Sequence, residues 1–134
     1  MTIHLQIVGA LFMLLALIHV GFPRYFDWKQ QLASLSLINR QMMQVHTFFI
    51  AFVVFLIGLL CFSSAEELTA TPLGRRICLG LGVFWSVRAL VQWFFYSREL
   101  WRGKRFETGI HLLFSGLWIY CMVVFLCAAT IKGM

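Results

Sequence analysis

Four uninterrupted apolar stretches, each about 20 residues long, limit this chain more than any other feature of its sequence. They run over residues 3–22, 42–62, 77–96 and 110–131. A helix needs roughly 20 residues to cross about 30 Å of hydrocarbon, and it satisfies every backbone polar group within its own segment. A membrane β-barrel would need alternating segments of about 10 residues, a pattern that these continuous runs do not have. We therefore predict four transmembrane helices.

The composition leaves little room for a soluble domain. Of 134 residues, 61% are hydrophobic and only 12% are charged, whereas a soluble domain has roughly 25% charged residues. Signatures of soluble enzymes are absent: the sequence has no G-x-S-x-G, no phosphate-binding glycine loop and no H-E-x-x-H. The catalytic residues, if the protein has any, are unknown from the sequence.

The links between the apolar stretches are short and cover residues 23–41, 63–76 and 97–109. Short links make sequential helices antiparallel neighbours. The sequence therefore predicts an all-α protein with one domain over residues 1–134, an antiparallel bundle of four transmembrane helices. Within the first link, apolar residues of the segment 28–41 recur at helical spacing beside basic and amide side chains. This pattern predicts a short amphipathic helix in the membrane interface.

The basic residues are distributed unevenly between the two sides of such a bundle. Seven of the eleven Lys and Arg residues lie in the first and third links. The opposite side carries Arg75, Arg76 and Lys132. The positive-inside rule then predicts that the first and third links are cytoplasmic and that both termini are outside. We interpret the net charge of +6 as topology and contact with anionic lipid, and we expect no nucleic-acid binding.

Three histidines fall at one predicted depth. His19 lies near the cytoplasmic end of the first span, His46 near the start of the second and His111 at the start of the fourth. Antiparallel order alone places all three within about one turn of the same interface. Neutral imidazole is a ligand of iron, copper and zinc, and two imidazoles on facing helices can hold a haem b.

The third span carries a polar stripe. Arg88, Gln92 and Tyr96 are spaced four residues apart and therefore share a helix face. Arg88 is near the predicted centre of the bilayer, where an arginine costs at least about 2.5–3.5 kcal/mol and needs a partner or water. All five acidic residues are in the links. The partner is therefore backbone carbonyls, water, another chain or an anionic ligand such as a haem propionate. The fourth span has a matching stripe of His111, Ser115, Trp118 and Met122.

These residues lead to a first hypothesis for function and two alternatives. The hypothesis is a cofactor-binding membrane protein with a cytoplasm-facing polar pocket, where His19, His46 and His111 are candidate ligands of haem b or of iron, copper or zinc. Arg88, Gln92 and Tyr96 would bind the same cofactor, and a quinone head group or a proton relay would use the same residues. The alternatives are an accessory subunit without any cofactor and an oligomeric transporter or channel. The expected partners are the lipid bilayer, a small ligand, and either copies of this chain or other subunits of a membrane complex.

Overall fold

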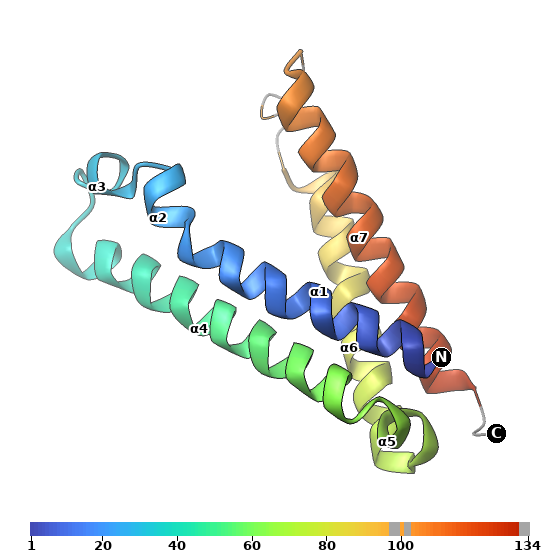
Figure 1. Cartoon of the computed structure of the whole chain (residues 1–134). Coiled ribbons are helices and arrows are strands. Elements are labelled where there is room, and N and C mark those ends of the chain that lie inside the picture. The colour runs from blue at the N-terminus through green and yellow to red at the C-terminus, as the bar shows by residue number, and fades with distance from the viewer. Residues whose placement is uncertain (97–99, 101–102, 132–134) are drawn as a thin grey trace. The chain divides into compact units, whose positions relative to one another are not determined.

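The computed structural model describes residues 1–96, 100 and 103–131. Arg98, Arg102 and Lys132, which enter the prediction of orientation, lie outside the described residues. In the part described, the elements are all helices, and Figure 1 labels them in chain order. They are α1 (Thr2–Val20), α2 (Phe22–Tyr25), α3 (Trp28–Gln31), α4 (Leu37–Ser63), α5 (Ala65–Ala70), α6 (Pro72–Phe94) and α7 (Arg105–Thr130).

Four of these helices, α1, α4, α6 and α7, are long and apolar enough to cross a membrane. The prediction of an all-α, multi-pass membrane protein with a four-helix architecture is therefore confirmed. Three of the four, α4, α6 and α7, begin about five residues before the apolar runs do. Polar caps start two of them, α4 and α6. Ser36 accepts a hydrogen bond from the Asn39 amide at the start of α4, and Thr71 accepts one from the Gly74 amide at the start of α6.

The chain divides into two compact units. The α1–α4 unit comprises Gln6–Ala65, and the α6–α7 unit comprises Met1–Leu5 together with Glu66–Met134. That both units form one domain stays a prediction.

In the α1–α4 unit, the two long helices approach until their backbones touch. A Cβ atom added to Gly58 would lie 2.7 Å from the Gly9 carbonyl oxygen, and one added to Gly9 would lie 2.5 Å from the Gly58 carbonyl oxygen. Only glycine permits this approach. Small residues at such crossings are typical of membrane helices, where packing must act without a hydrophobic driving force between helices.

The first link differs from the single amphipathic helix predicted over residues 28–41. It forms two one-turn helices, α2 and α3, and its last residues belong to the first turns of α4. Asp27, whose φ of 51° places it in the left-handed region, separates α2 from α3. The predicted segment itself is interrupted at residues 32–36, between the end of α3 and the start of α4. Ser36 then caps a new helix, so the continuous-helix prediction was wrong in its extent. Trp28 is nevertheless buried, at 8% exposure, as an anchor of this segment.

In the α6–α7 unit, α6 and α7 pack together over most of their length. Pro72 occupies the first turn of α6, where its missing N–H is not needed. Close approach again depends on glycine: a Cβ on Gly74 would clash with the backbone of Leu68 in α5, and a Cβ on Gly82 would clash with Leu126 in α7. The first turn of α1 also contacts α7 here, because His4 Nδ1 lies 2.9 Å from the Tyr120 hydroxyl.

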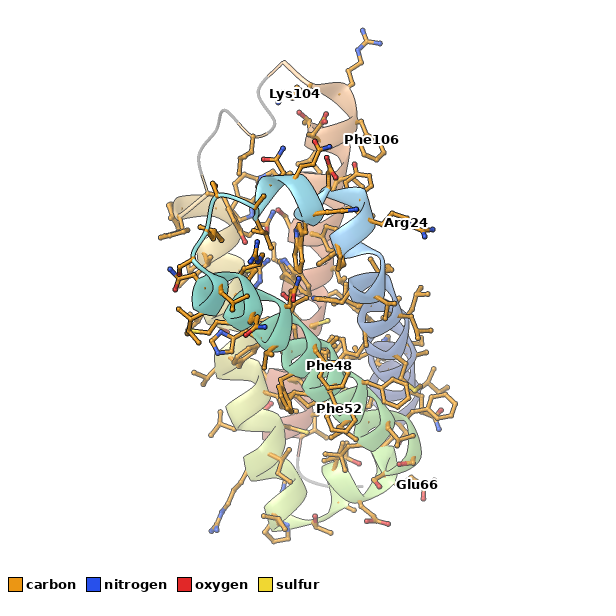
Figure 2. All side chains as sticks on the ribbon, turned by 90° about the vertical axis from the view of Figure 1, so that its left-hand side faces the viewer. Arg24, Phe48, Phe52, Glu66, Lys104 and Phe106 are labelled. Carbon is orange, nitrogen blue, oxygen red and sulfur yellow. The ribbon has the colours of Figure 1, made fainter. Side chains whose placement is uncertain are left out.

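The outer face of α4 is apolar and aromatic. Phe48 and Phe52 project from it, 62% and 48% exposed, and their rings stack with centroids 6.1 Å apart (Figure 2). Only 11% of the most apolar window of α4 is buried, compared with 33% for α7. In a soluble protein so much exposed apolar surface would promote aggregation. The exposed apolar surface of α4 supports contact between this helix and the lipid bilayer.

Candidate polar site in the α6–α7 unit

The buried polar side chains of the described residues gather in one place. They are Gln92, His111 and Ser115, which are 7%, 5% and 3% exposed. Gln92 is on α6, and the other two are on α7. Each is stabilised by a hydrogen bond, as a buried polar group requires. The Ser115 hydroxyl donates to the His111 carbonyl oxygen at 2.7 Å, while Gln92 and His111 belong to a longer chain of bonds.

That chain joins a guanidinium, an amide and an imidazole. Arg88 Nη1 donates to Gln92 Oε1 at 3.2 Å, and Gln92 Nε2 lies 2.8 Å from His111 Nδ1. Arginine has no acceptor, so the amide must turn its oxygen towards Arg88 and its NH₂ towards His111. His111 Nδ1 is therefore the acceptor of the second bond. In the neutral ring, the proton of His111 is then on Nε2.

Aromatic rings surround the guanidinium of Arg88. Its central carbon lies 5.0 Å from the centroid of Trp118 and 5.7 Å from that of Tyr96. Trp118 in turn stacks on Trp85, with centroids 4.8 Å apart and planes inclined by 15°. Trp93 packs edge-on against the His111 ring at 4.9 Å. Cation–π contacts of this kind are worth about 2 kcal/mol when desolvated, so the rings partly replace the carboxylate that Arg88 does not have nearby.

The site remains rich in hydrogen-bond donors. Among the described residues, no ion pair involves Arg88, and Gln92 supplies its one hydrogen bond. The indole Nε1 of Trp118 is buried and has no hydrogen-bond acceptor among the residues that the structure describes. Arginine and indole donate but do not accept. Chemically, the site can therefore hold a group that offers acceptor oxygens, and it favours a group that carries or gains negative charge.

Most of these residues could be named from the sequence. The structure brings together Arg88, Gln92, Tyr96 and His111, and the predicted α7 stripe supplies Ser115 and Trp118. Neither Trp93 nor Trp85 was predicted from the sequence as part of the site. The signal for Trp85 was its spacing, because it lies three residues before Arg88 and so shares a face with it.

His19 and His46 belong to the α1–α4 unit. His19 is half-buried, and its Nδ1 donates to the Leu15 carbonyl oxygen at 2.8 Å, while His46 is exposed. From the Gly9–Gly58 contact, His19 is 10 residues away along α1 and His46 is 12 residues away along α4, so His46 lies about two residues, or roughly 3 Å, beyond the level of His19. In the described residues there is no group of three or more His, Cys, Asp or Glu side chains that could hold a metal ion. A site shared by His19, His46 and His111 stays a prediction.

Comparison with known proteins adds no relative. No family model matches the sequence, and neither the curated proteins nor the solved structures contain a match to it. The function is therefore argued from the site itself.

Proposed function

We propose that this multi-pass membrane protein binds a lipid-soluble redox cofactor, a quinone, through the Arg88–Gln92–His111 site. Arg88 carries the proposal. It lies within a helix long enough to span the membrane, is held by Gln92, Trp118 and Tyr96, and has no ion pair among the described residues. A charge at such a position is costly without an acceptor and is a sign of function by default.

The chemistry of a quinone matches what the site offers. Its two carbonyl oxygens are acceptors, and the unsatisfied groups of Arg88 and Trp118 are donors. Reduction adds electrons to those oxygens, and a preorganised guanidinium stabilises charge that develops next to it. The ring is flat, and the site already contains flat rings that stack, Trp85 on Trp118. A quinone also reaches the site from the bilayer, the medium that the four apolar helices require.

Binding of a short-tailed ubiquinone to the purified protein tests the proposal, with quenching of tryptophan fluorescence as the readout. A hydrogen bond to a charged group is worth about 1.5–3 kcal/mol, so Arg88→Leu should weaken binding about 10- to 100-fold while expression is retained. Arg88→Lys keeps the charge but loses the planar stacking, and it should be intermediate. Arg76→Gln, at the exposed start of α6, is the control. Equal affinity of the Arg88→Leu and unmodified proteins would reject the proposal.

Haem b is a second candidate, and one observation favours it. The bond from His19 Nδ1 to the Leu15 carbonyl leaves the lone pair on Nε2, as in histidines that ligate a metal. His46 is the candidate partner in the same unit, and Arg40, also in this unit, would bind a propionate. An absorption spectrum with metal analysis tests this candidate. A Soret band lost in both His19→Ala and His46→Ala supports haem, and bound iron, copper or zinc without a Soret band supports a metal site. If neither a Soret band nor bound metal is found, this candidate has no support.

Orientation and assembly complete the proposal. We propose that the basic first and third links are cytoplasmic and that both termini are outside, so that the site opens towards the cytoplasm. Reporter fusions at the C-terminus test the orientation, and activity of a cytoplasmic reporter there would contradict it. We also propose that the chain works as a homo-oligomer or as a subunit of a membrane complex. If no cofactor binds, an accessory subunit becomes the preferred function, and a detergent-resistant oligomer would instead favour a transporter.

A further inference from the structure

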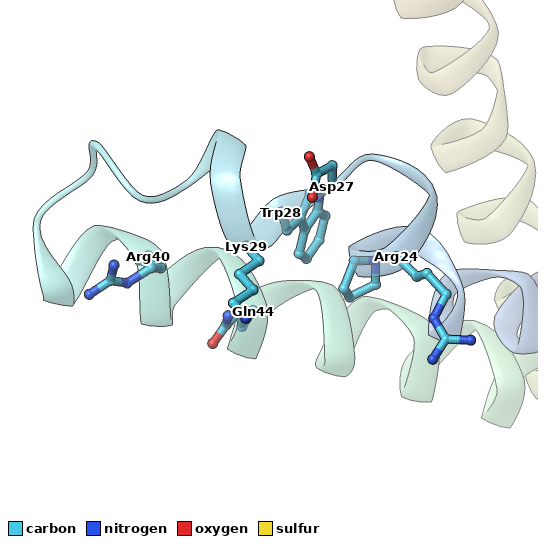
Figure 3. Close-up of a pocket in the computed structure, with 7 residues that line it drawn as sticks. Arg24, Asp27, Trp28, Lys29, Arg40 and Gln44 are labelled. Atoms are coloured by element: carbon cyan, nitrogen blue, oxygen red, sulfur yellow. The ribbon is translucent and has the colours of Figure 1, made fainter.

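A pocket of about 570 Å³ lies in the α1–α4 unit, where the first link meets the start of α4 (Figure 3). It is separate in sequence from the Arg88 site, and the function proposed above does not use it. Its charged and polar lining consists of Arg24 on α2, Asp27 between α2 and α3, Trp28 and Lys29 on α3, and Arg40 and Gln44 on α4.

The break in the first link builds this pocket. Asp27 adopts a left-handed conformation, which ends α2 and lets α3 start in a new direction. Aspartate is among the few residues that tolerate this conformation without a large penalty. Trp28, buried at 8% exposure, anchors the turn. As a result Arg24 and Lys29, which flank the turn, both line the same pocket.

Positive charge in the pocket is largely uncompensated. Three cationic side chains, Arg24, Lys29 and Arg40, line it beside the single carboxylate of Asp27. No ion pair joins Asp27 to any of them in the described part of the chain. Figure 3 shows Lys29 extending from α3 towards Gln44, with Arg40 and Arg24 to either side in that view. The side chains are therefore available to bind an anion.

The position of the pocket along the chain limits what the anion can be. Arg24 lies four residues past the end of α1 at Val20, and Arg40 lies in the first turn of α4. Both α1 and α4 are long and apolar enough to span a membrane, so the pocket is at the boundary where lipid phosphates lie. Large apolar side chains beside it are exposed, among them Tyr25 at 69% and Ile38 at 62%. They can contact the upper part of acyl chains.

We propose that this pocket binds the phosphate of an anionic phospholipid. Lys29 and Arg40 bind the phosphate oxygens, and Arg24 adds positive charge at the other side of the pocket. The Asp27 carboxylate accepts hydrogen bonds from hydroxyl groups of the head group. Phosphatidylglycerol has both features, one phosphodiester charge and a head group with two hydroxyls. A zwitterionic choline head group has neither net charge nor a hydroxyl donor, so the pocket discriminates against it. Free inorganic phosphate shares the anionic chemistry and is the competing source.

Native mass spectrometry of the whole chain tests the proposal. The protein is released from nanodiscs made of equal parts of phosphatidylcholine and phosphatidylglycerol, and the retained lipid is counted. We expect one phosphatidylglycerol to be retained in preference to phosphatidylcholine. Each cation near an anionic surface contributes roughly a fivefold preference. Lys29→Gln combined with Arg40→Gln should therefore reduce the selective retention about thirtyfold.

Two matched controls keep the result specific. Lys29→Arg with Arg40→Lys preserves both charges and should retain the lipid, which separates loss of binding from loss of folding. Arg75→Gln with Arg76→Gln removes two arginines from the start of α6 and should have no effect on retention. Equal retention of the two lipids, or an unchanged preference in the Gln variant, would overturn the proposal. Displacement of the lipid by millimolar inorganic phosphate would overturn the assignment to a lipid and identify a free-anion site.

Discussion

The two hairpins of this protein are built from similar apolar helices but are held together in different ways. In the α1–α4 unit, Gly9 and Gly58 bring two backbones into contact, and charged groups gather at one end. In the α6–α7 unit, polar and aromatic side chains of Gln92, His111 and Trp118 fill the interface. The difference teaches that overall hydrophobicity says little about how membrane helices pack. A few small or polar residues decide it.

The contrast also predicts different weaknesses. An interface of touching backbones has no side chain that can move aside, so it is sensitive to added volume. An interface of bonded side chains is sensitive to the loss of any one partner, because the other is then left buried and unsatisfied. Two substitutions test the two interfaces, and two more compare the helix caps of the two units, from the largest expected effect to the smallest.

Gly58→Ala should be the most damaging. Its Cβ would lie 2.7 Å from the Gly9 carbonyl oxygen and 2.9 Å from Phe12 Cβ, so α1 and α4 must separate. We expect a loss of about 2–3 kcal/mol in the free energy of unfolding, typical of overpacking. Unfolding in mixed detergent micelles measures it. The control is Gly80→Ala, where the added Cβ meets nothing within 4 Å; a comparable loss there would show that the backbone contact is unimportant.

Gln92→Leu should be next in size. It breaks both bonds of the chain and leaves His111 Nδ1 without its donor. Leaving a buried polar group unsatisfied costs about 1–3 kcal/mol, so we expect a loss near 2 kcal/mol in the same assay. Substituting the exposed Gln41 by Leu is the matched control and should change little. Equal stability of the two variants would mean that the Arg88–Gln92–His111 hydrogen bonds do not stabilise the α6–α7 interface.

Loss of the two helix caps should have smaller effects of unequal size. Thr71 Oγ1 accepts from the Gly74 amide at 2.9 Å, whereas Ser36 Oγ accepts from the Asn39 amide at 3.4 Å. Thr71→Ala should cost about 1 kcal/mol, the usual value of an N-cap, and Ser36→Ala should cost less. Thr71→Ser keeps the hydroxyl and serves as control. The reverse order of the two alanine variants would contradict the ranking by bond length.

The last test does not concern stability. It measures the tautomer of one histidine in each unit. His19 donates from Nδ1 to a carbonyl, and His111 accepts at Nδ1 from an amide. Nitrogen-15 spectra of histidine-labelled protein should therefore show opposite neutral tautomers, with the proton on Nδ1 in His19 and on Nε2 in His111. Assignment comes from His19→Gln and His111→Gln samples. A proton on Nδ1 of neutral His111 would refute the proposed direction of the Arg88–Gln92–His111 chain, and a proton on Nε2 of neutral His19 would refute its bond to the Leu15 carbonyl.

The helices and part of the site could be predicted from the sequence, because both depend on periodicity. Spans follow from runs of apolar residues, and the shared face of Arg88 and Gln92 follows from a spacing of four. Periodicity does not say which face of one helix meets which face of another, so the Gly9–Gly58 contact could not be predicted. The break at Asp27 was also missed, since a left-handed residue other than glycine leaves no pattern in the sequence.

The amide of Gln92 limits what its hydrogen-bond chain can carry. A hydroxyl or an imidazole can take a proton on one side and release one on the other, but a carboxamide keeps its hydrogens on nitrogen and its lone pairs on oxygen. Gln92 therefore interrupts any proton wire between Arg88 and His111, although the two bonds still polarise one another. The α6–α7 hairpin passes an electrostatic influence along these bonds but no proton, a useful property in a helix pair long enough to span a membrane.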